Sequence, residues 1–437
     1  MPAAAACLFV GTRATGPGHQ AERAGGNAWS GRQVEPPPSR MAIALITGAT
    51  GSLGCEIVRS LLARDGETHV IALIRAGDDL TLERRRRQLV QGLPGVHGKR
   101  VRVVRGDMTE ARLGLSPADY AALTKRVDRV VHVAATTHLG RPLAEARRRN
   151  VGGTTQALLL CRRIREHGKE GRLDYVSTAY VAGDRADVVF ESELDVGQGF
   201  RNTYERSKFE AERLCRAAMR ELPIAIYRPS IIVGHSVSGE TTRYKTLYWP
   251  MQLLIPFYLR WRAVTRLVPL PLGRECPLDI VPVDYVAESV ATLYSRAEAA
   301  GRCYHLAAGV DGAVTIEQLV NLVCEHFHGP RRRYVDPRGH VRWLGRALRP
   351  LLRRLSPGFV RRVEHYLPYA VQNPRFDVSN ARAAGLAPPP FAAYFPRLLA
   401  YAHAADFGRG RPPVPGQRLP SPERPGPPVA AEWIEHS

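Results

Sequence analysis

A tyrosine and a lysine four residues apart, Tyr204 and Lys208, are the residues whose types and spacing point most directly to chemistry. This spacing places both side chains on one face of a helix. A phenol has an ordinary pKa of about 10, so Tyr204 needs a neighbouring charge to act as an acid or base at neutral pH. The ammonium of Lys208 can lower the pKa of Tyr204 and can also hold the ribose of a nicotinamide. The alternative is an ordinary solvated helix face.

Two hydroxyl residues, Ser177 and Thr178, end a predicted strand, and Tyr204 follows Thr178 by 26 residues. Thr178 can donate a hydrogen bond to a substrate carbonyl oxygen while Tyr204 supplies a proton. The alternative for Thr178 is a β-branched strand residue with no chemical role. We expect Thr178, Tyr204 and Lys208 to form the reactive centre, and we expect no metal there.

A glycine-rich turn lies upstream, directly after the predicted strand Ile43–Thr47 and before a helix-like stretch at residues 55–62. Its glycines have GxxGxxG spacing. Glycine permits the tight turn and lets the backbone approach a pyrophosphate, whose charge the helix N-terminus stabilises. Three glycines alone are weak evidence, but this position between strand and helix predicts a dinucleotide site. The expected contacts are Gly48, Thr50, Gly51, Ser52, Leu53 and Gly54.

The residue after the second predicted strand indicates which dinucleotide binds. An acidic residue there would bind the ribose 2′-hydroxyl of NAD, whereas the strand Val70–Ile74 is followed by Arg75. A guanidinium suits a 2′-phosphate, so we expect NADPH; a solvated strand-end arginine is the alternative. Asp107 and Met108 follow the third strand, where Asp107 is either a cap on the adenine amino group or a turn residue.

The order of the predicted elements indicates the fold class. Short apolar, β-branched runs alternate with amphipathic stretches of helical length, as in βαβ units whose parallel sheet is covered on both faces. The sequence therefore predicts an α/β fold with a doubly wound parallel sheet, a Rossmann domain. The predicted strands are Ile43–Thr47, Val70–Ile74, Arg102–Arg105, Arg129–Val133, Leu173–Val176 and Ile224–Tyr227.

Composition excludes several classes of protein. The chain has 437 residues, of which 44% are hydrophobic, enough to bury a large core and too many for a disordered protein. Seven cysteines without a CxxC pair argue against a disulfide scaffold and suit a reducing compartment. No apolar run reaches the roughly 18 residues of a membrane span, so we expect a cytoplasmic protein.

The net charge is +21, and only five of the 62 basic residues are lysines. Such an excess attracts nucleic acid, anionic lipid or an acidic carrier protein. Because no aromatic-interleaved binding motif accompanies the charge, we expect no nucleic acid partner. Residues 1–40 and the Pro-rich tail 411–437 are predicted to be disordered. Alternatively, residues 1–40 are a mis-called extension, and the protein starts at Met41. Residues 331–410 are predicted to be a basic helical region.

Between Ala42 and Val320 the sequence resembles an extended short-chain dehydrogenase/reductase. The motifs TGATGSLG (47–54), HVAA (132–135) and YxxxK (204–208) are typical of all extended members. The resemblance is narrower to the thioester reductase and fatty acyl-CoA reductase, male-sterility-like branch. That branch is indicated by LIRA (73–76), LGLS (113–116), YERSKFEAE (204–212) and DIVPVDYVA (279–287). One departure is His235, where the branch usually has an acidic residue; we expect a loop residue there.

The resemblance implies a smaller C-terminal substrate lobe, so that residues 41–330 form an NADP-binding reductase domain with segments of that lobe. It implies that Thr178, Tyr204 and Lys208 are the catalytic residues and that Arg75 binds the NADPH phosphate. Ala134 and Ala135 would line the floor of the cofactor site, and Asn150 would support the surrounding network.

The resemblance also implies the reaction, which is NADPH-dependent reduction of an acyl thioester to an aldehyde or alcohol. The thioester would be carried by coenzyme A or an acyl carrier protein. Tyr248–Tyr258 would line an acyl channel, contact a membrane surface or form ordinary core. The basic stretch Arg342–Leu355 would be a plain surface helix, a peripheral membrane contact or a carrier dock. The alternatives are a reductase or epimerase of a sterol-like alcohol or nucleotide sugar, and a non-catalytic NADP-sensing protein.

Overall fold

The computed structural model describes residues 42–241 except 65, 92 and 94, residues 244, 247, 248, 250–252 and 270, and residues 272–329, 332–334, 365–410 and 413. All of them fall within one compact unit, Met41–Ser437. The predictions for residues 1–40 and Arg342–Leu355 lie outside the described residues. The same holds for nearly all of the tail from residue 411 and for most of Tyr248–Tyr258.

A seven-stranded parallel sheet forms the centre of this unit, in the order β11-β7-β5-β4-β1-β2-β3. From the central β1–β4 pair, later strands are added outward on both sides of the sheet. This strand order confirms the predicted doubly wound fold. The six predicted strands are present with ends shifted by at most two residues, and β11 is additional. The strands are β1 (Ile43–Thr47), β2 (His69–Ile74), β3 (Val101–Arg105), β4 (Arg129–His132), β5 (Arg172–Val176), β7 (Ile224–Pro229) and β11 (Cys303–Leu306).

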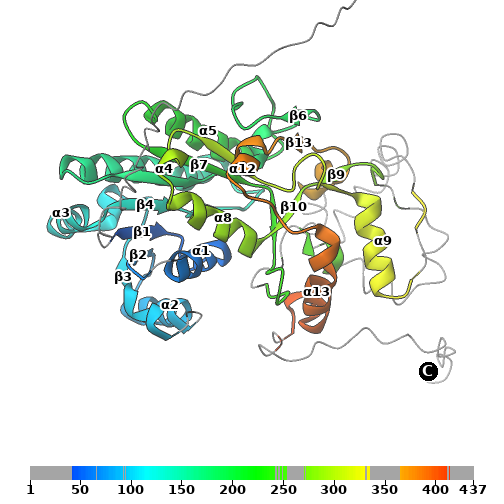
Figure 1. Cartoon of the computed structure of the whole chain (residues 1–437), viewed down its shortest axis with the longest axis horizontal. Helices are drawn as coiled ribbons and strands as arrows, with labels where there is room; N and C mark the ends of the chain where they lie inside the picture. Colours follow the sequence, from blue (N-terminus) through cyan, green and yellow to red (C-terminus); the bar gives the residue numbers. More distant parts are fainter. Residues whose placement is uncertain are drawn as a thin grey trace, which may run out of the picture. The chain divides into compact units, whose positions relative to one another are not determined.

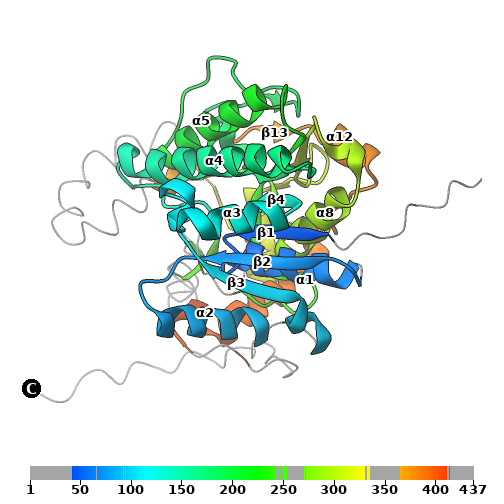
Figure 2. The ribbon, with the colours of Figure 1, turned by 90° about the vertical axis from the view of Figure 1, so that its left-hand side faces the viewer.

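Helices cover both faces of the sheet, which explains why its strands carry apolar residues on both faces (Figure 2). The first face packs against α1 (Ser52–Arg64), α2 (Asp79–Gln91) and α8 (Val283–Tyr294). The second face packs against α3 (Pro117–Arg126), α4 (Leu143–Glu166) and α5 (Thr203–Ala218). The result is a three-layer α/β/α domain.

The switch in strand order determines where a ligand can lie. β1 pairs with both β2 and β4, with Thr47 opposite His132. In such sheets ligands bind in the crevice at the carboxyl ends of the strands, next to this switch point. The loops after β1, β4 and β5 therefore converge on one edge of the sheet.

A smaller lobe with its own hydrophobic core follows the sheet, as predicted (Figure 1). Its apolar residues include Leu278, Leu319 and Leu398, and its core extends to Phe407. A further strand pair, β6 (Val188–Val189) with β13 (Arg375–Phe376), returns the C-terminal part of the chain to the loops after β5. The lobe contains β8 (Ile231–Val233), β9 (Pro277–Leu278), β10 (Ile280–Pro282), β12 (Val314–Thr315), α9 (Ile316–His326) and α13 (Phe391–Ala404); α12 (Ser379–Ala383) packs by β11.

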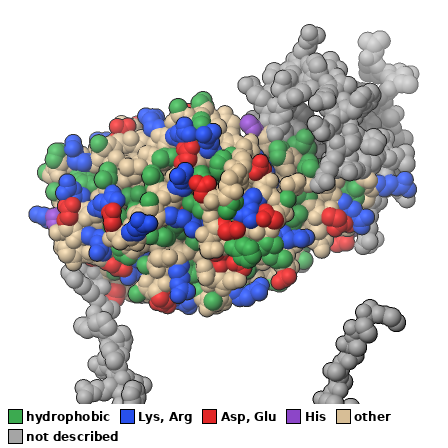
Figure 3. Space-filling model, turned by 90° about the horizontal axis from the view of Figure 1, so that it is seen from above, with side chains coloured by type: hydrophobic (Ala, Val, Ile, Leu, Met, Phe, Trp, Pro, Cys, Tyr) green, Lys and Arg blue, Asp and Glu red, His purple; other side chains and the backbone are tan. Residues whose placement is uncertain are grey.

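The surface charge is mixed. On the face drawn in Figure 3, Lys and Arg side chains lie interspersed with Asp and Glu. Surface ion pairs of this kind include Arg147 with Glu210 at 2.6 Å and Arg163 with Glu166 at 2.6 Å. Among the helices that the structure describes, none is long and apolar enough to cross a bilayer.

Candidate active site

The loop at residues 48–54 forms the first part of the site, and we call it the phosphate cradle. Gly48 has a φ of +73°, and a Cβ atom built there would lie 2.7 Å from the backbone nitrogen of Ala134. A Cβ atom on Gly54 would lie 2.1 Å from the carbonyl oxygen of Gly48. Only glycine therefore allows the start of α1 to pack this closely against β1 and the end of β4.

The cradle remains accessible at the N-terminus of α1, where a diphosphate would be stabilised by the helix. The backbone nitrogen of Ala134 donates to the Thr47 hydroxyl at 3.2 Å, which fixes the end of β4 beside the loop. The residues predicted to contact the cofactor here are at least partly exposed: Thr50, Gly51, Ser52, Leu53, Ala134 and Ala135.

Arg75 lies directly after β2 with its side chain 57% exposed and its guanidinium 3.9 Å from the Asp107 carboxylate. A second arginine, Arg85 on α2, donates a hydrogen bond to the Arg75 carbonyl oxygen. The sequence analysis did not single out Arg85, because its helical position alone gives no signal. Two arginines thus lie at the end of β2, a suitable arrangement for an anion.

Asp107 makes the hydrogen bonds of a turn residue. One of its carboxylate oxygens accepts hydrogen bonds from the backbone nitrogen and the hydroxyl of Thr109, both at 2.9 Å. Its other oxygen faces Arg75. Met108 is buried in the core beneath α3 and α4, so it contributes packing at this edge.

Tyr204 and Lys208 lie one turn apart on α5, as predicted, and Thr178 lies just after β5 opposite them. Asn202 caps the helix by accepting from the backbone nitrogen of Glu205 at 3.0 Å, which starts α5 at Thr203. The Thr178 side chain lies near enough to the Tyr204 phenol to oppose a rise in its pKa, and the Thr178 hydroxyl donates to the Pro229 carbonyl at 3.5 Å. The structure therefore brings all three predicted residues to the same edge of the sheet.

The electrostatics of Tyr204 differ from the expectation. Burial raises the pKa of Tyr204 to about 12, and the nearby Thr178 side chain only partly opposes this rise. The expected lowering by Lys208 is not seen, because the ammonium donates instead to the Tyr175 hydroxyl and the Val176 carbonyl on β5, both at 2.8 Å. Tyr204 is therefore a neutral phenol at neutral pH and can donate a hydrogen bond.

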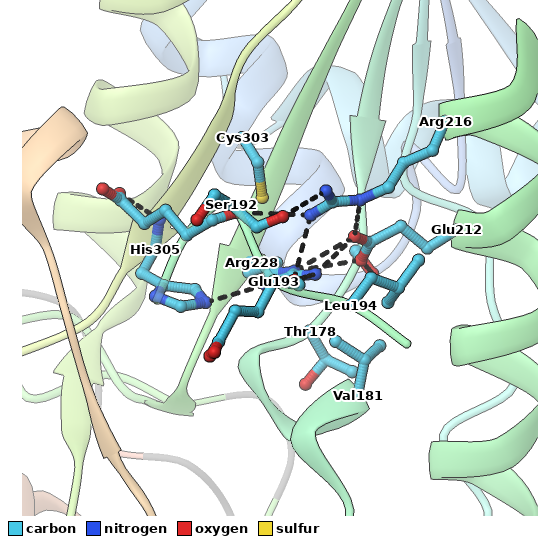
Figure 4. Close-up of polar contacts among 12 residues, drawn as sticks. Thr178, Val181, Ser192, Glu193, Leu194, Glu212, Arg216, Arg228, Cys303 and His305 are labelled. Carbon is cyan, nitrogen blue, oxygen red and sulfur yellow. Dashed lines mark hydrogen bonds and ion pairs between the residues drawn. The ribbon is translucent and has the colours of Figure 1, made fainter. Parts of the chain in front are cut away.

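A buried ion pair lies near Thr178 (Figure 4). Glu212, one turn beyond Lys208 on α5, contacts the guanidinium of Arg228 on β7 at 2.6 Å, and both side chains are fully buried. The Ser177 hydroxyl donates to Glu212 at 2.6 Å, and Arg228 contacts His305 on β11 at 3.1 Å. This network ties the residue before Thr178 to the helix that carries Tyr204, and sequence spacing gave no sign of it.

The C-terminal segment His365–Asn373 lies against the start of α5. The Tyr369 hydroxyl donates to the carboxylate of Glu205, the neighbour of Tyr204. Arg201 stacks over the Tyr369 ring, 4.9 Å from its centroid, and donates to the Gln372 carbonyl at 2.9 Å. We call these contacts the C-terminal latch; they hold this segment to the start of α5.

Two further predicted residues have structural contacts. The Asn150 side chain bonds the backbone of Thr136 and donates to the Ser207 hydroxyl at 2.9 Å, so it supports the network between α4 and α5. His235 lies in a loop and accepts a hydrogen bond from the backbone nitrogen of Val237 at 3.2 Å.

Known proteins resemble this chain in both sequence and fold. Residues 46–290 match the family model described as male sterility protein. The L-2-aminoadipate reductase large subunit of Penicillium chrysogenum is 33% identical over 266 residues, which cover 56% of this chain and 18% of that protein. The chain spans between 5% and 27% of the length of the curated relatives compared.

Two solved structures share the architecture. The terminal R domain from the myxalamid PKS-NRPS biosynthetic pathway has a TM-score of 0.70 and 24% identity, covering 86% of this chain and 94% of that one. The reductase (R) domain of a non-ribosomal peptide synthetase from Mycobacterium tuberculosis has a TM-score of 0.60 and 25% identity, covering 84% and 93%. Since the family model covers more than half of the chain, the chain belongs to the male sterility protein family.

Proposed function

We propose that this protein is an NADPH-dependent reductase of acyl thioesters carried by an acyl carrier protein or coenzyme A. The observation that carries the proposal is the placement of Thr178 beside Tyr204, with the ammonium of Lys208 one helical turn away and the cradle on the same sheet edge. The names of relatives, such as the L-2-aminoadipate reductase and the R domains of peptide synthetases, support thioester reduction as the reaction class.

The residues present fit the cofactor. The cradle is free of side chains at Gly48 and Gly54, where a Cβ atom would clash with the backbone. Arg75 and Arg85 lie where a 2′-phosphate would extend from the second strand, which supports NADPH over NADH. Lys208 would hold the nicotinamide ribose, and the bound cofactor would supply the hydride.

Thr178 and Tyr204 have complementary roles in this proposal. Both hydroxyls are hydrogen-bond donors, and the raised pKa of Tyr204 keeps its proton in place at neutral pH. Donors that lie where an oxygen gains negative charge lower the barrier to acyl reduction, as an oxyanion hole does. The carbonyl carbon gains a hydride, the carbon–sulfur bond breaks, and the thiol leaves with a proton, so that an aldehyde forms. A second hydride would give the alcohol.

The test is a coupled assay on the purified full-length protein. NADPH or NADH is added with a series of acyl-CoA thioesters and with acyl-loaded carrier protein, while nicotinamide oxidation and free thiol are followed together. One thiol per NADPH is expected for an aldehyde product, and one thiol per two NADPH for an alcohol. NADPH oxidation without thiol release, on sterol-like or nucleotide-sugar carbonyl compounds instead, would overturn the proposal.

A further inference from the structure

Lys208 is held in a fixed place by β5. Its side chain is 2% exposed, and its ammonium donates to the Tyr175 hydroxyl and the Val176 carbonyl, both at 2.8 Å. Both acceptors come from the strand that ends just before Thr178. An ammonium has three N–H donors, so these two bonds leave one for the side on which Tyr204 and a ribose would lie.

Tyr175 makes a second contact with the same ammonium. The Lys208 nitrogen lies 4.3 Å from the centroid of the Tyr175 ring, within the range of a cation–π interaction. The Tyr175 side chain is fully buried, and its ring stacks on His132 of β4 at 5.9 Å. The ring therefore has little freedom to move away from the lysine.

A chain of hydrogen bonds leads from Tyr175 into α4 and back to α5. The Tyr175 hydroxyl shares a hydrogen bond with the Thr154 side chain, and the Thr154 hydroxyl donates to the Asn150 carbonyl at 2.7 Å. The Asn150 amide donates to Ser207 at 2.9 Å, and Ser207 donates to the Tyr204 carbonyl at 3.0 Å. Tyr175 thus connects Lys208 to a network that ends on the backbone of Tyr204.

We infer that Tyr175 is a positioning residue, which holds the Lys208 ammonium beside Tyr204 through its hydroxyl and the face of its ring. The inference rests on the proposed function for the role of Lys208, but the position of the ammonium is measurable without turnover. Nothing in the spacing of the YxxxK motif reveals Tyr175, because it contacts Lys208 across 33 residues of sequence.

The charges around Lys208 make its protonation sensitive to this contact. Burial lowers the pKa of Lys208 to about 8, and the negative charge of Glu212 on α5 acts in the opposite direction. Tyr204 on the same helix is a neutral phenol, and His132 on β4 has a pKa lowered to about 3 by burial and by Lys208, so it is neutral as well. The hydroxyl and ring of Tyr175 favour the charged ammonium.

The test uses the small number of lysines in the chain, which is five. Protein labelled with ¹³C and ¹⁵N at lysine gives five Cε signals, and the Lys208→Met variant identifies the one from Lys208. Its chemical shift is followed as pH is raised in wild type, Tyr175→Phe and Tyr175→Leu. Tyr304→Phe, a buried tyrosine change on β11, is the control.

The variants separate the two contacts of Tyr175. Tyr175→Phe keeps the ring, so the ring-current shift of the Lys208 signal stays while its titration moves about one pH unit lower, as expected for loss of one hydrogen bond to a charge. Tyr175→Leu removes both contacts, so the ring-current shift disappears and the titration moves further. The control leaves the signal as in wild type.

An unchanged Lys208 titration in Tyr175→Phe would overturn the inference, whether or not the protein reduces thioesters. In the coupled assay we expect Tyr175→Phe to lower kcat/KM about tenfold and to shift its alkaline limb to lower pH, with NADPH affinity changed less than threefold. A protein that shows the predicted shifts but releases no thiol would refute the proposed function and leave the position of the ammonium established.

Discussion

The phosphate cradle and the seam between β5 and α5 lie at the same edge of the sheet but are built in different ways. We define the seam by Tyr175–Thr178 on the strand side and by Tyr204, Lys208 and Glu212 on the helix side. The cradle is a partly exposed backbone turn, and its requirement is the absence of two Cβ atoms. The seam is made of buried polar side chains that bond to one another.

This difference predicts how each region responds to change. A backbone surface contributes binding and tolerates variation in its exposed side chains, since those make few contacts. A buried polar network is sensitive at every member, because removing one partner leaves another unsatisfied in a low-dielectric interior. Substitutions in the cradle should therefore change cofactor affinity, and those in the seam should change turnover and folding.

The largest effect is expected at Tyr204. Tyr204→Phe removes the hydroxyl that would donate to the thioester oxygen, and kcat should fall about 10³-fold. NADPH affinity, measured by fluorescence titration, should stay within a factor of about two, because the phenol is not part of the cradle. Turnover near the wild-type rate would remove Tyr204 from the reaction.

The next effect concerns stability. Glu212→Gln leaves Arg228 buried without a countercharge, and the free energy of unfolding should fall by about 3 kcal/mol in urea denaturation. The matched control is Glu210→Gln on the exposed side of the same helix. Loss of its ion pair with Arg147 should lower the free energy of unfolding by less than about 1 kcal/mol. Equal losses in the free energy of unfolding for the two variants would show that the buried ion pair contributes no more to stability than the exposed one.

In the cradle, Gly54→Ala should weaken NADPH binding about 30-fold, since the new Cβ atom would lie 2.1 Å from the Gly48 carbonyl and the loop must shift. Gly66→Ala is the control, because nothing lies within 4 Å of a Cβ atom there. If Gly54→Ala instead lowers kcat at saturating NADPH and leaves affinity intact, the division between cradle and seam is wrong.

Arg75 should determine which nucleotide is preferred. Arg75→Ala should weaken NADPH binding about tenfold and leave NADH binding unchanged, since one charge-assisted contact to a 2′-phosphate is lost. Arg87→Ala, an exposed arginine paired with Glu83 on α2, is the comparison. An unchanged NADPH-to-NADH ratio would reject the assignment.

The smallest effect near neutral pH is the dependence of kcat/KM on pH. Because the pKa of Lys208 is about 8, the ammonium is lost as pH rises through that value. kcat/KM should therefore fall to about half its plateau near pH 8 and about tenfold per unit above it. A flat profile up to pH 9.5 would show that the charge on Lys208 is not required.

The sequence predicted the sheet well, because its strands are short runs of mostly apolar, β-branched residues between helical stretches. The strand that it missed, Cys303–Leu306, contains His305, which is fully buried but polar. Its burial depends on Arg228 and on a carbonyl of Asp377, contacts that come from distant parts of the chain. The pattern of neighbouring residues in the sequence could not reveal these contacts.

The candidate site likewise has one part that the sequence predicted and one part that only packing determines. The positions of Tyr204 and Lys208 on one helix face are confirmed, because a spacing of four residues is a local property. The ammonium of Lys208 points to Tyr175 rather than to Tyr204, and this choice is made by packing between α5 and β5. The catalytic and cofactor roles of the predicted residues stay predictions until the experiments above are done.

The C-terminal latch has a consequence for the order in which the protein becomes active during its synthesis. The last strand of the main sheet ends at Leu306, yet Tyr369, which bonds to Glu205 beside Tyr204, follows 63 residues later. At ordinary rates of translation this interval takes about 3 to 13 seconds. A nascent chain in that interval can assemble the parallel sheet while the start of α5 still lacks its hydrogen bond from Tyr369.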